Sequence, residues 1–140
     1  MRILGIDYGD ARTGVAVSDP MGWTAQGVTT ISERNNPEKV AEKVLEFIKE
    51  YSPTEIVLGL PKNMDGSQGF RTDATKKFAE ILKTKTDIPL IFWDERLTTV
   101  AAARTLNETN VRGSKRKGII DTVAATYILQ GYLDNKAVKK

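Results

Sequence analysis

Apolar and polar residues alternate along the start of the chain, which is the pattern of half-buried β-strands. The pattern predicts strands over residues 2–8, 12–18 and 27–31. A tight Gly9-Asp10-Ala11 link joins the first two, so we expect a hairpin there, with the third strand antiparallel to the second. Together these segments predict an antiparallel meander.

Beyond Asn36 the apolar residues recur at helical spacing. Asn36 and Pro37 suit an N-cap and a first helical position, and the amphipathic helix that they begin is expected to end before Pro53. Later helices are predicted from about Phe70 to Lys83, from Thr98 or Thr99 to near Asn107, and from about Gly118 to Asp134.

Two short and almost wholly apolar segments, residues 55–60 and 89–93, have the composition of buried parallel strands. A meander followed by helical crossovers gives one mixed sheet with helices on both faces. We therefore expect an α/β fold with a five-stranded sheet of three antiparallel and two parallel strands, the first strand at its centre. No linker or repeat divides the 140 residues, so a single domain over residues 1–140 is expected.

The composition excludes several kinds of site. The chain has no cysteine and no histidine, which excludes a thiol nucleophile, a thiolate- or His-ligated metal and a Ser-His-Asp triad. Lys and Arg number 21 against 18 Asp and Glu, a net charge of +3 that permits a polyanionic partner without requiring one. The sequence has no apolar run of membrane-spanning length and no signal-peptide pattern, so we expect a cytoplasmic protein with no membrane partner.

Three acidic residues stand at positions where a carboxylate costs free energy. Asp7 ends the strand expected at the centre of the sheet, Glu95 follows the fifth strand, and Asp121 opens the last helix beside its apolar stripe. Each also has a structural interpretation. Asp7 could begin the turn into Gly9, while Glu95 and Asp121 could serve helix N-termini, where the helix dipole favours negative charge.

Together the three carboxylates indicate a cation site. If they converge at one end of the sheet they repel each other, so either some stay protonated or a divalent cation neutralises them. Without His or Cys, an all-oxygen site suits Mg²⁺ or Mn²⁺. Such ions can clamp a phosphodiester and activate water for in-line attack, so Asp7, Glu95 and Asp121 are predicted as metal ligands and catalytic residues.

Basic and polar loops flank these acids. A loop over residues 110–117 precedes Asp121, and another over residues 61–69 follows the fourth strand; either could hold nucleic-acid phosphates or be an ordinary solvated loop. The residues predicted to contact nucleic acid are Arg12, Lys62, Asn63, Arg96, Arg112, Lys115, Arg116 and Lys117. Trp23 and Phe70 lie in or beside loops, where they could stack on bases or cover the core.

Four motifs follow one another along the chain: Gly5-Ile6-Asp7-Tyr8-Gly9 with Arg12-Thr13-Gly14-Val15-Ala16, Gly59-Leu60-Pro61-Lys62-Asn63-Met64-Asp65-Gly66, Asp94-Glu95-Arg96-Leu97-Thr98-Thr99, and Asp121-Thr122-Val123-Ala124-Ala125. In this order and spacing they resemble the YqgF- or RuvX-type bacterial proteins, which are described as Holliday-junction resolvases and as nucleases of pre-16S ribosomal RNA. The resemblance spans essentially the whole chain. It implies a ribonuclease H-like fold, an acidic triad at Asp7, Glu95 and Asp121, and a metal-dependent nuclease that processes pre-16S rRNA or cleaves branched DNA.

Two departures from other ribonuclease H-like nucleases leave the number of metal ions open. The fourth strand ends Leu58-Gly59-Leu60-Pro61 without an acid, and Glu95 looks like its replacement. Ala124 and Ala125 stand where many junction resolvases carry a further acid or His.

Two rival functions remain at this point. One is a non-catalytic RNA-binding factor for ribosome maturation that uses the same basic surface. The other is an ATPase or sugar kinase with a similar strand-turn-strand pattern, but such proteins need two of these domains and 140 residues supply one. The sequence does not choose between RNA and DNA. A homodimer would match a two-fold junction, although nothing in the sequence marks an interface.

Overall fold

The computed structural model describes residues 2–9, 11–61, 69–94 and 114–138, with side chains for all of these except residues 70, 114–121 and 137–138. The strands are β1 (Ile3–Asp7), β2 (Arg12–Ser18), β3 (Ala25–Ser32), β4 (Glu55–Leu60) and β5 (Leu90–Asp94). The helices within the described ranges are α1 (Pro37–Tyr51), α2 (Phe70–Lys83) and α4 (Ser114–Val138). The helix predicted from Thr98 or Thr99 to near Asn107 lies outside the described residues.

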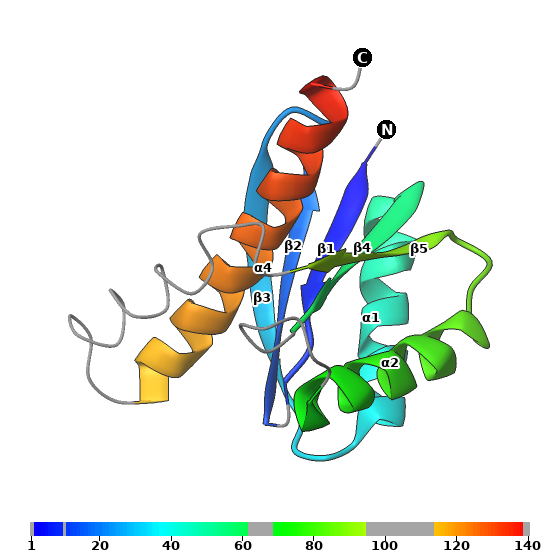
Figure 1. The fold of residues 1–140 in the computed structure, drawn as a ribbon, viewed down its shortest axis with the longest axis vertical. Helices are drawn as coiled ribbons and strands as arrows, with labels where there is room; N and C mark the ends of the chain where they lie inside the picture. Colours follow the sequence, from blue (N-terminus) through cyan, green and yellow to red (C-terminus); the bar gives the residue numbers. More distant parts are fainter. Residues whose placement is uncertain (1, 10, 62–68, 95–113, 139–140) are drawn as a thin grey trace.

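The five strands form one mixed sheet in the order β3-β2-β1-β4-β5 (Figure 1). β1 pairs antiparallel with β2 and parallel with β4; β2 pairs antiparallel with β3, and β4 parallel with β5. The predicted fold class and the central place of the first strand are therefore confirmed.

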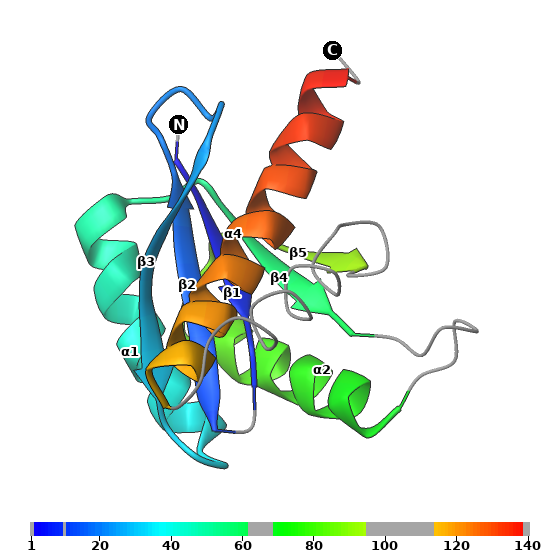
Figure 2. The ribbon, with the colours of Figure 1, turned by 90° about the vertical axis from the view of Figure 1, so that its left-hand side faces the viewer.

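Alternation along β1 divides its side chains between two cores. Leu4 and Ile6 lie in the core under α1 and α2, whereas Ile3 lies in a second core with the buried residues of α4. Figures 1 and 2 show α1 and α2 on one face of the sheet and α4 across the other. Because Asp7 follows Ile3 at strand spacing, it belongs to the α4 face.

Local chemistry fixes the predicted ends of α1. The Asn36 side chain accepts from the backbone N–H of Lys39 at 3.2 Å, and Pro37 is the first helical residue. Ser52 ends the helix in a left-handed conformation (φ 49°), directly before Pro53. α2 also spans the range predicted from its apolar spacing.

α4 begins earlier than predicted. It starts at Ser114 rather than near Gly118, so Lys115, Arg116 and Lys117 are in the helix and not in a loop. Lys and Arg are good helix formers, and a lone interior glycine costs only about 1 kcal/mol, so neither the charge run nor Gly118 stops the helix. As a result, Asp121 lies about two turns into α4 instead of at its start.

Gly9 allows the close turn between β1 and β2. A β-carbon at residue 9 would stand 2.4 Å from the carbonyl oxygen of Arg12, which is closer than real β-carbons approach. The close approach of the Arg12 carbonyl is sufficient to explain a glycine at residue 9.

Candidate functional site

The parallel strands end together at one edge of the sheet. β1 runs parallel to β4 with Ile6 opposite Leu58, and β4 runs parallel to β5 with Leu60 opposite Asp94. The carboxyl ends of β1, β4 and β5 therefore share one edge, where α/β sheets bind their ligands. Asp7 and Asp94 are the last residues of their strands at this edge.

Asp7 is a buried strand residue. It is 4% exposed and pairs with Gly14 of β2 in the antiparallel ladder. Asp7 is therefore part of the sheet, as the last residue of β1 before the turn. A buried carboxylate at the end of a central strand is a candidate site residue, and its role stays a prediction.

Asp121 lies within the helical backbone of α4, and its spacing relates it to buried residues of that helix. Ala124, Ala125 and Ile128 follow it at positions on the same helix face, and each is 0% exposed in the core between α4 and the sheet. The dipole interpretation of Asp121 fails, because that effect falls off within the first turn and α4 begins about two turns earlier.

Three contacts bring this part of α4 to the Asp7 end of the sheet. Asp7 pairs with Gly14, Gly14 pairs with Thr30 of β3, and the Thr30 hydroxyl lies 2.6 Å from the Thr122 hydroxyl. Thr122 directly follows Asp121. The structure thus places Asp7 and the backbone of Asp121 at the same end and on the same face of the sheet.

The remaining predicted site residues divide into two groups. Arg12 is the first residue of β2, half-buried at the Asp7 end, and Lys115, Arg116 and Lys117 occupy the first turn of α4. The others lie outside the described ranges: Lys62, Asn63, Glu95, Arg96 and Arg112. Among the side chains that the structure describes, no three acids form a metal-binding group. The three-acid site therefore stays a prediction.

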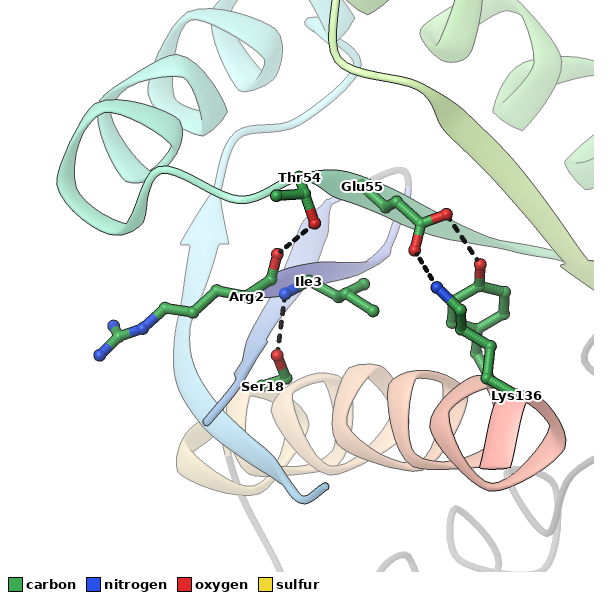
Figure 3. A network of polar contacts seen from close by, with 7 residues as sticks. Arg2, Ile3, Ser18, Thr54, Glu55 and Lys136 are labelled. Atoms are coloured by element: carbon green, nitrogen blue, oxygen red, sulfur yellow. Dashed lines mark hydrogen bonds and ion pairs between the residues drawn. The ribbon is translucent and has the colours of Figure 1, made fainter. Parts of the chain in front are cut away.

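A polar cluster holds the other end of α4. Lys136 Nζ lies 2.7 Å from Oε1 of Glu55, at the start of β4 (Figure 3). Tyr132 donates to Oε2 of the same carboxylate at 3.1 Å. Burial, followed by the hydrogen bond and charge of Glu55, raises the pKa of Tyr132 to about 12. At the start of β3, the backbone N–H of Ala25 donates to Gln130 Oε1. These contacts hold the C-terminal half of α4 against the sheet, at the end opposite the candidate site.

Two other acids in the described part, Glu33 and Asp19, have structural partners. The hydrogen bond from Lys43 lowers the pKa of Glu33, and Lys39 lies 3.8 Å from the same carboxylate. Burial acts to raise the pKa of Asp19, but hydrogen bonds from the backbone N–H groups of Trp23 and Thr24 outweigh it and lower that pKa. Asp19 thus stabilises a turn, and Glu33 pairs with lysines of α1.

The structure also shows features that the sequence did not reveal. Nothing in residue spacing connects Thr30 with Thr122, which are far apart along the chain. A cleft of about 250 Å³ opens at the opposite end of the sheet and is lined in part by Arg2, Ser18 and Tyr51. Trp23 is 65% exposed, so it does not cover the core. No helix in the described ranges is long and apolar enough to cross a membrane.

Comparison with known proteins gives a consistent result. A family model described as "RuvX: Holliday junction resolvase" matches residues 1–135. A relative from Ruminiclostridium cellulolyticum, named "Putative pre-16S rRNA nuclease", is 54% identical over 140 residues, which cover 100% of this chain and 99% of the relative.

Two solved structures are similar to this chain in fold. Thermus thermophilus RuvC in complex with a Holliday junction substrate is 13% identical with a TM-score of 0.57, over 98% of this chain and 96% of that chain. A ROK family protein from Streptococcus pneumoniae in complex with sucrose is 21% identical with a TM-score of 0.51, but the match covers 77% of this chain and only 37% of that chain. At these identities the likeness concerns the fold, which is ribonuclease H-like.

Proposed function

Because the chain belongs to the RuvX family of Holliday junction resolvases, we propose that it is a metal-dependent endonuclease that hydrolyses phosphodiester bonds in structured nucleic acid. The observation that carries this proposal is the burial of Asp7, at 4% exposure, on the sheet face and at the sheet end where α4 brings Asp121.

The donor set at this end fits a divalent cation. Asp7 offers carboxylate oxygen in a buried setting, and the proposed partners Glu95 and Asp121 would add only carboxylate oxygen. Mg²⁺ and Mn²⁺ prefer such hard ligands. When bound, the cation would stabilise the negative charge that develops on the phosphodiester during hydrolysis.

The basic residues are proposed to hold the substrate backbone. Arg12 lies at the Asp7 end, and Lys115, Arg116 and Lys117 form the first turn of the helix that carries Asp121. Phosphate contacts of this kind set the position of a nucleic acid without reading its sequence. We assign the same role to Lys62, Asn63, Arg96 and Arg112.

Pre-16S rRNA is the proposed first substrate, since the 54% identical relative carries that substrate in its name. Branched DNA is the second proposed substrate, because the family is described as Holliday junction resolvases. An rRNA substrate also favours the cytoplasm as the place of action. The kinase alternative is set aside, because the chain matches only 37% of the ROK family protein and belongs to a nuclease family along its length.

The test is cleavage of matched pre-16S rRNA and four-way DNA junction substrates with Mg²⁺ or Mn²⁺, with an EDTA control. We expect metal-dependent cleavage, with the RNA cut at lower enzyme concentration than the junction. Binding that survives EDTA, with no cleavage of either substrate at any metal concentration, would instead establish the non-catalytic RNA-binding alternative.

A further inference from the structure

One hydroxyl pair joins α4 to the edge of the sheet. Thr30 Oγ1 of β3 lies 2.6 Å from Thr122 Oγ1, a short contact in which one hydroxyl donates to the other. Thr126 Oγ1 in turn donates to the Thr122 carbonyl at 2.8 Å, within the helix. Thr122 thus connects this turn of α4 to β3 by a hydrogen bond.

A glycine makes room for this contact. A β-carbon at Gly27 would stand 2.6 Å from the Thr122 methyl group, closer than real β-carbons approach. Gly27 does not have a positive φ, so its role is to leave space. The Thr122 side chain is therefore fixed by a hydrogen bond on one side and by a fitted contact on the other.

The contact lies at the level of the candidate site. Thr30 pairs with Gly14, and Gly14 pairs with Asp7, so the hydroxyl pair and Asp7 occupy one row across three strands. Asp121 directly precedes Thr122. Since one residue of an α-helix turns by about 100°, rotation of this helical turn would change the direction of residue 121 relative to the sheet.

The fold does not depend on this contact alone. Glu55, Tyr132 and Lys136 hold the other end of α4, about 20 Å along the helix at 1.5 Å per residue. Removal of the hydroxyl pair would therefore loosen the Asp121 turn without releasing the helix.

We propose that Thr30 and Thr122 are positioning residues that set the rotation of α4 so that the Asp121 carboxylate meets Asp7 around the cation. This inference rests on the proposed function. The two threonines touch neither substrate nor metal in this role; they act through Asp121. Removal of a group hydrogen-bonded directly to a metal ligand typically weakens metal binding by about 10–100-fold, and the Thr30–Thr122 contact acts one step further out, so the lower end of that range is expected.

The experiment compares Thr122→Val, which keeps the shape and removes the hydroxyl, with Thr122→Ser, which keeps the hydroxyl. Thr126→Val is the matched control, because it removes a hydroxyl whose hydrogen bond stays within the helix. Mn²⁺ affinity is measured by calorimetry without nucleic acid, alongside Tm and RNA cleavage. Thr122→Val should bind Mn²⁺ about tenfold more weakly with a small change in Tm, while Thr122→Ser and Thr126→Val stay near wild type.

The double variant Thr30→Val with Thr122→Val provides a second measurement. It should bind Mn²⁺ no more weakly than either single variant, because both remove the same contact. Unchanged Mn²⁺ affinity in Thr122→Val, or an equally weakened affinity in Thr122→Ser, would overturn the inference and leave the nuclease intact. A wild-type protein that binds no Mn²⁺ would overturn the proposed function and this inference together. Wild-type protein that binds Mn²⁺ but cleaves nothing would overturn the nuclease alone, and the affinities would still decide the positioning role.

Discussion

Gly5 of β1 lies directly beneath Leu129 of α4. A β-carbon at residue 5 would stand 2.7 Å from the Leu129 Cβ and 3.3 Å from the Ala125 carbonyl oxygen. Gly5 therefore lets the helix settle onto the central strand. Asp7 lies two residues after Gly5 on the same face of β1, and Asp121 lies one helical turn before Ala125 in α4. The close approach at Gly5 therefore brings the helix that carries Asp121 onto the strand that carries Asp7.

Replacing Gly5 with Ala should push α4 away from β1. Overpacking of this kind costs about 1–3 kcal/mol, which urea denaturation would measure as a lower unfolding midpoint. Gly131→Ala is the matched control, since residue 131 shares the helix face of the exposed Tyr127 and Asp134 and alanine favours a helix. Equal stability of Gly5→Ala and wild type would show that α4 can shift freely.

Neutralising the basic helix start should weaken nucleic-acid binding. With Lys115, Arg116 and Lys117 changed to Gln, the slope of log affinity against log salt should fall by about 0.7–0.9 for each phosphate that is no longer bound. Lys49→Gln with Lys85→Gln is the control, because these exposed lysines lie at the opposite end of the sheet. An unchanged slope in the triple variant would mean that the first turn of α4 faces solvent and contacts no phosphate. Adding Arg112→Gln extends the test to the remaining basic residue predicted before this helix.

The segment after β4 carries a separate prediction. It follows the carboxyl end of a strand at the Asp7 edge, where loops hold ligands. Lys62→Ala and Asn63→Ala should each raise the KM for the cleaved substrate several-fold while Tm is unchanged. If both variants bind and cleave as wild type does, this segment is a plain connection.

The raised pKa of Tyr132 predicts a decrease in stability in alkali. In the unfolded chain the phenol ionises near pH 10, and in the folded protein only near pH 12, so the free energy of unfolding should fall between these values. The decrease should approach about 2 kcal/mol and should be smaller in Tyr132→Phe. Tyr127→Phe, at a 43% exposed position, serves as control and should keep the wild-type profile. A Tyr132→Phe profile that matches wild type would contradict the assignment.

Local chemistry explains which elements could be predicted. The ends of α1 follow from Asn36, Pro37 and Pro53, and each acts on its neighbours along the chain. By contrast, β3 starts at Ala25, two residues before the predicted strand. The backbone N–H of Ala25 donates a hydrogen bond to Gln130 of α4, which is far away along the chain. Neither composition nor spacing indicates that contact.

Part of the candidate site is also predictable from residues that act locally along the chain. Asp7 stands out because an acid at the end of an apolar central strand is costly, and it is buried as expected. The predicted start of α4 is wrong, because a run of Lys and Arg is as typical of a solvated loop as of a first helical turn. Thr30 and Thr122 carry no local signal, since only the folded sheet brings them together. The role of Glu95 stays a prediction.

The most direct test is Asp7→Asn, with Mn²⁺-dependent cleavage and metal-free Tm measured on the same preparation, and with Asp134→Asn as an exposed acidic control. If the acids hold a cation, cleavage by Asp7→Asn should fall at least about 100-fold. Its metal-free Tm should hold or rise, because a cluster of like charges is relieved. A stable Asp7→Asn protein that cleaves at the wild-type rate would contradict the assignment of this end of the sheet as the active site.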